Sequence, residues 1–215
     1  MTKNIKYISE IECDKERLMK YLFIKVATVL SAVKPSVMMR YAVSDKSKRF
    51  NSYHLFTQHQ NEIYETLGLD YLELKRTDKE LLVIFYDKDT LENAISNSTI
   101  QNFLDSRGYS REQTLDEKLH LLKTRFSGDS LSNEIGVFLG YPLEQIEQLA
   151  EQNADYAYLP TSMWKVLGSA TGSLNKTALF RKIEAVAADV ATKYGSTEKC
   201  IERFKTFAGV TTRTA

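Results

Sequence analysis

The chain has 215 residues, of which 43% are hydrophobic and 27% are charged, a composition that can bury a core and excludes disorder except at the ends. Its 29 Lys and Arg residues against 28 Asp and Glu residues give a net charge of +1, so no global field draws the chain to nucleic acid or an anionic membrane. The N-terminal segment lacks the apolar core of a secretory signal and the longest apolar run, Leu81 to Tyr86, cannot span a bilayer, so we expect a soluble cytoplasmic protein without membrane contact.

The first part of the chain predicts two helices separated by a basic loop. Apolar residues recur every three or four positions over residues 14–33, and Lys34-Pro35 ends this helix because the residue before a proline avoids the α region. Residues 34–49 carry five basic residues against one acidic residue, which we interpret as a solvated loop. A second helix is expected from Phe50 to Leu67, with Gly68 as its stop.

The clearest β signal is a hairpin at about residues 69–87. Two apolar runs are joined there by the polar turn 77–80, and the second run is apolar on both faces. A strand of that kind is central and needs helices over both sides. Such helices are expected from Asp89 to about Leu104 and from Ser110 to about Phe126.

A helix-turn-helix corner is predicted at residues 130–152. The stretch NEIGVFLGYPLEQI, residues 133–146, has helical apolar spacing on both sides of a Gly-Tyr-Pro. A helix capped by Ser130 or Ser132 should end at Leu139, since Gly140 suits a left-handed conformation and Pro142 suits the first turn of a new helix. The residues expected to share a core there are Ile135, Phe138, Leu139, Ile146 and Leu149.

The rest of the chain predicts extended segments within residues 156–166, a long helix over 179–190 and a short helix that includes Phe204. Gly195 separates the last two helices. The fold class predicted for residues 1–215 is therefore a single α+β domain, mostly helical and packed on a small sheet built around the hairpin.

The corner also has the spacing of a DNA-reading motif, with Gly136 four residues before Gly140 and Ile146 six residues after it. The second helix, residues 143–155, carries four acids and no base. Such a helix is repelled by the phosphates of a groove, so DNA is a disfavoured partner.

No GxSxG, HExxH or Cys-His signature occurs, so the sequence identifies neither a catalytic set, nor a metal site, nor a cofactor. The cysteines, Cys13 and Cys200, are expected to be free thiols that are buried or partly buried. The three histidines, His54, His59 and His120, are expected to be ordinary surface or half-buried residues.

One group of polar and aromatic residues is a candidate ligand site. Lys34, Tyr141 and Trp164 each lie at a break in regular structure, where binding groups are often carried. They would supply a cation, a hydroxyl and a stacking plane around one concavity. The alternative is that the aromatic residues belong to the core and the lysines are solvated. The full candidate set is Lys34, Arg125, Glu134, Tyr141, Trp164 and Lys165.

The corner sequence resembles the hallmark of a bacterial family, domain of unknown function 3793, which reads His-Glu-Ile-Gly-x-Phe-Leu-Gly-Tyr-Pro-x-Glu-Asp-Val. Asn133 replaces the first residue and Gln145-Ile146 replace the last two. Residues 30–38 and 162–167 resemble two further family motifs, so the resemblance covers about residues 27–204 with short extensions at both ends. It implies one domain and no particular activity.

Two classes of function are therefore predicted. A non-catalytic intracellular binding or adaptor protein is favoured, because the acidic stretch 133–160 and the basic stretches 34–49 and 161–215 suit contacts with another protein. The alternative is an enzyme that binds a small ligand or cofactor around Lys34, Tyr141 and Trp164.

Overall fold

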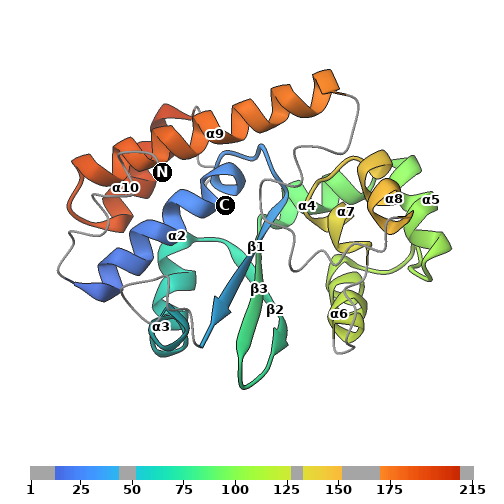
Figure 1. Ribbon diagram of the computed structural model, residues 1–215, viewed down its shortest axis with the longest axis horizontal. Coiled ribbons are helices and arrows are strands. Elements are labelled where there is room, and N and C mark those ends of the chain that lie inside the picture. Colours follow the sequence, from blue (N-terminus) through green and yellow to red (C-terminus); the bar gives the residue numbers. More distant parts are fainter. Residues whose placement is uncertain (1–12, 44–51, 127–132, 152–169, 209–215) are drawn as a thin grey trace.

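The computed structural model describes residues 13–43, 52–126, 133–151 and 170–208, which form a sheet between two groups of helices. In Figure 1, α2, α3, α9 and α10 lie on one side of the sheet and α4 to α8 on the other. This arrangement confirms the α+β fold class.

The first group of helices contains α2 (Asp14–Leu30), α3 (Ser52–Leu67), α9 (Ala170–Lys193) and α10 (Thr197–Phe207). The helix α2 packs against the other three. The last long helix already begins at Ala170, well before the residues from which it was predicted.

The sheet contains β1 (Ser36–Ala42), β2 (Asp70–Arg76) and β3 (Glu80–Tyr86), antiparallel and in the order β1-β3-β2. The hairpin prediction is confirmed by β2 and β3. The prediction of a loop after Pro35 is wrong over β1, because Arg40 is the one charged residue within the strand. It points to solvent while its neighbours Met39 and Tyr41 are buried.

The central strand β3 contributes buried side chains to both sides of the sheet. Its side chains alternate between two hydrophobic clusters, as the period of two in a strand requires. Leu81, Val83 and Phe85 belong to the cluster under α2, and Leu82, Ile84 and Tyr86 to the opposite one. The prediction of a strand covered on both faces is confirmed.

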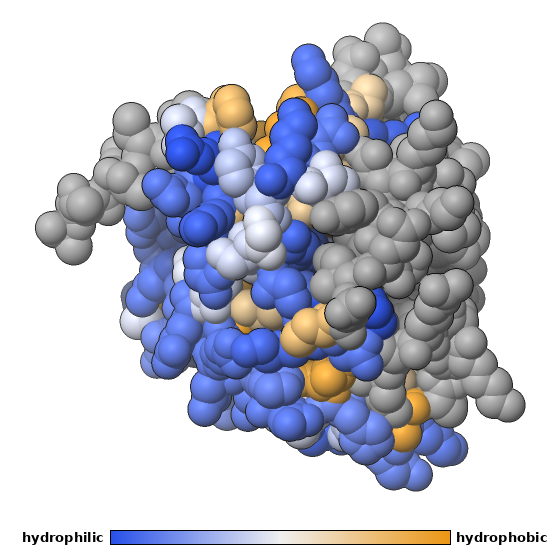
Figure 2. Space-filling view, turned by 90° about the vertical axis from the view of Figure 1, so that its left-hand side faces the viewer, coloured by the Kyte–Doolittle hydropathy of each residue, from blue (hydrophilic) through white to orange (hydrophobic). Residues whose placement is uncertain are grey.

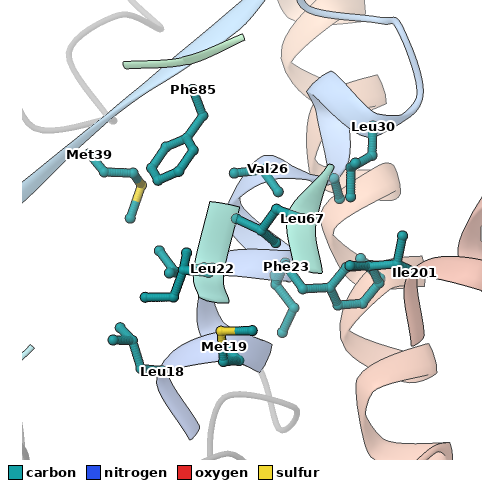
Figure 3. Packing of buried hydrophobic residues seen from close by; sticks show 14 of the residues in the cluster. Leu18, Met19, Leu22, Phe23, Val26, Leu30, Met39, Leu67, Phe85 and Ile201 are labelled. Carbon is teal, nitrogen blue, oxygen red and sulfur yellow. The ribbon is translucent and has the colours of Figure 1, made fainter. Parts of the chain in front are cut away.

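The first core lies between the sheet and the α2 group of helices. Figure 3 shows side chains from α2, α3, α10 and β3 meeting there. Phe23 and Phe204 pack edge to face with ring centres 5.6 Å apart, and Tyr41 stacks on Phe56 at 4.3 Å. These contacts tie the C-terminal helix and the edge strand to α2 and α3.

The second core lies under α4 (Lys88–Ile95), α5 (Ser98–Ser106), α6 (Leu115–Arg125), α7 (Ile135–Phe138) and α8 (Leu143–Glu151). Its members include buried residues of all five helices and of β2 and β3. Examples are Leu74, Ile84, Leu91, Leu104, Leu119, Phe138 and Ile146.

Two predicted helices in this half are corrected. The single helix expected from Asp89 to Leu104 is divided into α4 and α5, because the Asn97 side chain accepts from the Thr99 N–H and caps a new helix. The next helix begins after Thr114 instead of Ser110, since Thr114 and Glu117 form a capping box.

Among the residues drawn in colour, the surface seen from the α3 and α10 side is mostly hydrophilic, with some apolar residues between them (Figure 2). In the described ranges, none of the helices combines the length and apolar character needed to cross a membrane.

Candidate functional site

The Gly-Tyr-Pro break joins two separate helices at a fixed corner. Gly140 has φ 76°, a left-handed conformation that favours glycine. The Tyr141 N–H donates to the Gly136 carbonyl at 2.9 Å, and Pro142 accepts from Gln145 N–H at 3.0 Å as α8 begins. The predicted end of the first helix before Gly140 is therefore confirmed.

Close contacts explain why the corner has glycine, which lacks a Cβ, at positions 136 and 140. A Cβ added to Gly136 would lie 2.8 Å from Ile146 Cγ1, and one added to Gly140 would lie 2.6 Å from Pro35 Cδ. The spacing of Gly136, Gly140 and Ile146 thus reflects helix packing that needs no DNA. Ile135, Phe138, Leu139 and Ile146 are buried in the second core as predicted, while the side chain of Leu149 and the caps Ser130 and Ser132 lie outside the described residues.

The corner is docked on the turn that leads into β1. Pro35 is buried against Gly140, and the Ser36 hydroxyl donates to the Phe138 carbonyl at 2.6 Å. The Asp87 N–H also donates to the Pro35 carbonyl, at 3.3 Å. This docking places Lys34 beside the corner.

Lys34 lies against two aromatic rings. Its Nζ is 4.4 Å from the ring centre of Phe180 on α9 and 5.4 Å from that of Tyr141. The turn that presents it is tight: the N–H groups of Val33 and Lys34 both donate to the Thr28 carbonyl, and Ala32 has φ 53°. A left-handed alanine is strained, so the packing around it holds this turn in place.

The charge of Lys34 is only partly compensated within the described part of the chain. No carboxylate or carbonyl there lies within hydrogen-bonding distance of its Nζ, and Glu184, which pairs with Lys25 at 3.7 Å, acts on it from farther away. A cation on an aromatic ring gains about 0.5–2 kcal/mol, whereas removing an ammonium from water costs several kcal/mol. Burial accordingly lowers the pKa of Lys34, with Glu184 opposing that shift.

Burial raises the pKa of the Tyr141 phenol to about 12, so the phenol stays neutral into the alkaline range. Its half-buried ring forms one wall beside the Lys34 ammonium and Phe180 forms another. Phe180 was not predicted as a site residue, since its spacing in the last long helix indicated only a core position.

Arg125 and Glu134 form a second, separate group. The Glu134 carboxylate is 1% exposed and forms an ion pair with Arg125, and the Tyr109 hydroxyl donates to it at 3.4 Å. Arg125 also donates to the Arg107 carbonyl and lies 4.8 Å from the Tyr109 ring centre. This network joins the end of α6 to the start of α7, so it stabilises the fold of the corner.

The six predicted site residues are therefore divided. Lys34 contacts Tyr141, and Arg125 contacts Glu134, while Trp164 and Lys165 lie outside the described residues, as do the extended segments expected near Pro160. Ligand binding by these residues stays a prediction.

The other candidate groups offer no metal site within the described ranges, where no cluster of three or more potential ligands occurs. Cys13 is exposed and Cys200 is buried, and both are free thiols. The burial expected for the cysteines is confirmed for Cys200 and wrong for Cys13, which is the N-cap residue of α2. His54 and His120 are exposed and His59 is half-buried, as expected.

A family model described as "Protein of unknown function (DUF3793)" matches residues 22–201. This range includes both the turn at Lys34 and the Gly-Tyr-Pro corner. Searches of the curated proteins and of the solved structures give no match.

Proposed function

The chain belongs to the DUF3793 family of proteins of unknown function, and we propose that it is a non-catalytic cytoplasmic binding protein that acts through protein–protein contacts at the corner. The recognition surface is the outer face of α8, where Glu144 and Glu147 are exposed. Its partner is a protein with a complementary basic surface.

The observation that carries this proposal is the division of α8 into two faces. Gln145 and Ile146 are buried, and Ile146 packs closely against Gly136, while the two glutamates face solvent. The carboxylates are thus presented by a helix that is already fixed by its packing. A surface fixed before association loses less conformational freedom on binding.

The same geometry argues against duplex DNA as the partner. In a helix-turn-helix protein the second helix enters the major groove between phosphates. Here this helix would bring Glu144 and Glu147 to that position, and their charges are repelled by the phosphates.

The proposal is tested by reversing the charges on α8. We expect a partner that crosslinks to the wild-type protein in cells to be lost from the double variant Glu144→Lys, Glu147→Lys. The matched control is Glu65→Lys, Glu92→Lys, which changes the net charge equally at exposed positions of α3 and α4. The control should keep the partner.

Two results would overturn the proposal. One is an identical set of crosslinked proteins for the wild type and both double variants. The other is a gel shift of duplex DNA by the wild-type protein that is abolished by replacing Leu143 or Gln145, since DNA would then be read through this corner.

A further inference from the structure

Lys34 differs from the lysines that are fully buried in the described residues. Lys20 donates to the Ala191 carbonyl at 2.9 Å and the Tyr194 carbonyl at 2.7 Å, and Lys118 donates to the Gln113 carbonyl at 2.5 Å. Those cations have acceptors inside the protein. Lys34 has two ring faces and, within the described ranges, no oxygen acceptor.

Aromatic rings and oxygen acceptors interact with different features of an ammonium group. An aromatic face attracts the charge, but the three N–H bonds of the ammonium are best satisfied by oxygen lone pairs. Because Lys34 is half-buried, part of its side chain stays accessible from outside. An oxyanion that reaches Nζ would supply both the opposite charge and the missing acceptors.

We propose that Lys34, with the rings of Tyr141 and Phe180 as walls, binds the anionic group of a small ligand, either a carboxylate or a phosphate. The rings suit a ligand whose anionic group is attached to an apolar or aromatic body. The nearby Glu184 carboxylate pairs with Lys25 at 3.7 Å and makes no hydrogen bond to the Lys34 Nζ, on which it acts only from a distance. This site is independent of the α8 surface and does not rest on the protein–protein proposal.

The pKa of Lys34 provides a way to measure anion binding at this site. Burial lowers the pKa of Lys34, and a bound anion favours the charged amine, so binding must raise that pKa again. By the same linkage, affinity for the anion should fall as pH rises through the pKa of Lys34.

The test uses the full chain with its lysines ¹³C-methylated, which keeps their charge, and NMR to follow each amine. Inorganic phosphate and succinate are the two probes. We expect at least one of them to raise the pKa of Lys34 at concentrations that leave the NMR signal of the exposed Lys79 unchanged. Response to phosphate alone indicates a phosphorylated ligand and response to succinate alone a carboxylated one.

Variants separate the site from general charge effects. Lys34→Met should weaken binding of the active probe roughly tenfold or more, while Lys34→Arg and the control Lys79→Met, at an exposed position between β2 and β3, should retain it. The proposal is overturned if neither probe moves the pKa of Lys34 in the wild-type protein. It is equally overturned if Lys34→Met binds the probe as well as the wild type does.

Discussion

Two lysines reach α9 at different points, and their surroundings are opposite in kind. Lys20, 3% exposed, donates to two carbonyls at the C-terminal end of α9, where the helix dipole also favours a cation. Lys34 reaches the Phe180 region of the same helix and finds only aromatic faces among the described residues. A buried cation whose hydrogen bonds are all made within the chain contributes to folding. Lys34 lacks such acceptors among the described residues, and the proposal that it binds an anion rests on this difference.

The largest expected effect is a difference in the free energy of unfolding between variants of Lys20 and Lys34. Lys20→Met removes two charge-assisted hydrogen bonds and leaves two carbonyls at the end of α9 without this partner, which should destabilise the protein by about 3 kcal/mol. Lys34→Met should not destabilise the protein and should stabilise it by about 1 kcal/mol or more, because it removes a burial cost that the rings offset only in part. Urea denaturation measures both. Equal losses for the two variants would contradict the distinction.

The next largest effect is expected at the contact between Gly140 and Pro35, which places the corner beside Lys34. Gly140→Ala should destabilise by about 2–3 kcal/mol, since the new Cβ is strained at φ 76° and would lie 2.6 Å from the rigid Pro35 ring. The matched control is Gly68→Ala, with φ 60° and open space around the Cβ, for which about 1 kcal/mol is expected. Denaturation of both variants isolates the contact with Pro35. If Gly140→Ala lowers the free energy of unfolding no more than Gly68→Ala does, the Pro35 ring moves aside at little cost and the prediction is wrong.

A smaller effect concerns the turn before Lys34. Ala32→Gly should stabilise the protein by up to about 1 kcal/mol, because glycine tolerates φ 53° while the more flexible unfolded chain offsets part of the gain. Thermal denaturation checks the sign. A clear loss of stability would mean that the Ala32 methyl group packs favourably enough to outweigh its backbone strain.

The smallest expected effect is the pH dependence of stability that comes from Lys34. Its folded-state pKa is lowered by burial, so between that value and the unfolded-state pKa of about 10.4 the unfolded chain holds more protons. The free energy of unfolding contributed by Lys34 therefore rises with pH through this window. Tyr141, with its pKa raised to about 12, acts in the opposite sense, and its contribution is lost as pH rises through that value.

The Lys34→Met variant isolates the lysine term in this experiment. The difference in stability between the wild type and the variant, measured by urea denaturation from neutral to alkaline pH, should move in favour of the wild type. A difference that stays constant would mean that Lys34 titrates as it does in the unfolded chain.

The parts of the fold that were predictable from sequence are those with strong local signals. The run from Leu81 to Tyr86 is apolar on both faces, which left a central covered strand as the natural interpretation. Gly140 and Pro142 likewise indicated where one helix ends and the next begins. The edge strand β1 was missed because the basic residues that follow it in sequence dominated the interpretation of residues 34–49, although β1 itself contains only one charged residue. The division at Asn97 depends on one side-chain cap, which spacing alone does not reveal.

The candidate site was predictable in part for a different reason. Lys34 and Tyr141 were grouped because both lie at breaks between elements, and the structure brings them together. Phe180 and Pro35 complete their surroundings, but they belong to a helix and a turn whose approach is decided by tertiary packing. Glu134 and Arg125 were grouped with Lys34 on their polar character, although they form an ion pair of their own.

Because β3 contributes side chains to both hydrophobic clusters, it should couple the unfolding of the two halves of the molecule. Alternate side chains of β3 belong to the two clusters, so we expect that neither half of the molecule opens without exposing apolar side chains of the other. The backbone N–H groups of β3 that bond to β1 and β2 should then exchange with solvent only through global unfolding, whereas those of α5, at the margin of one cluster, exchange through local opening. In the described chain, β3 is the element that makes two helical layers unfold as one unit.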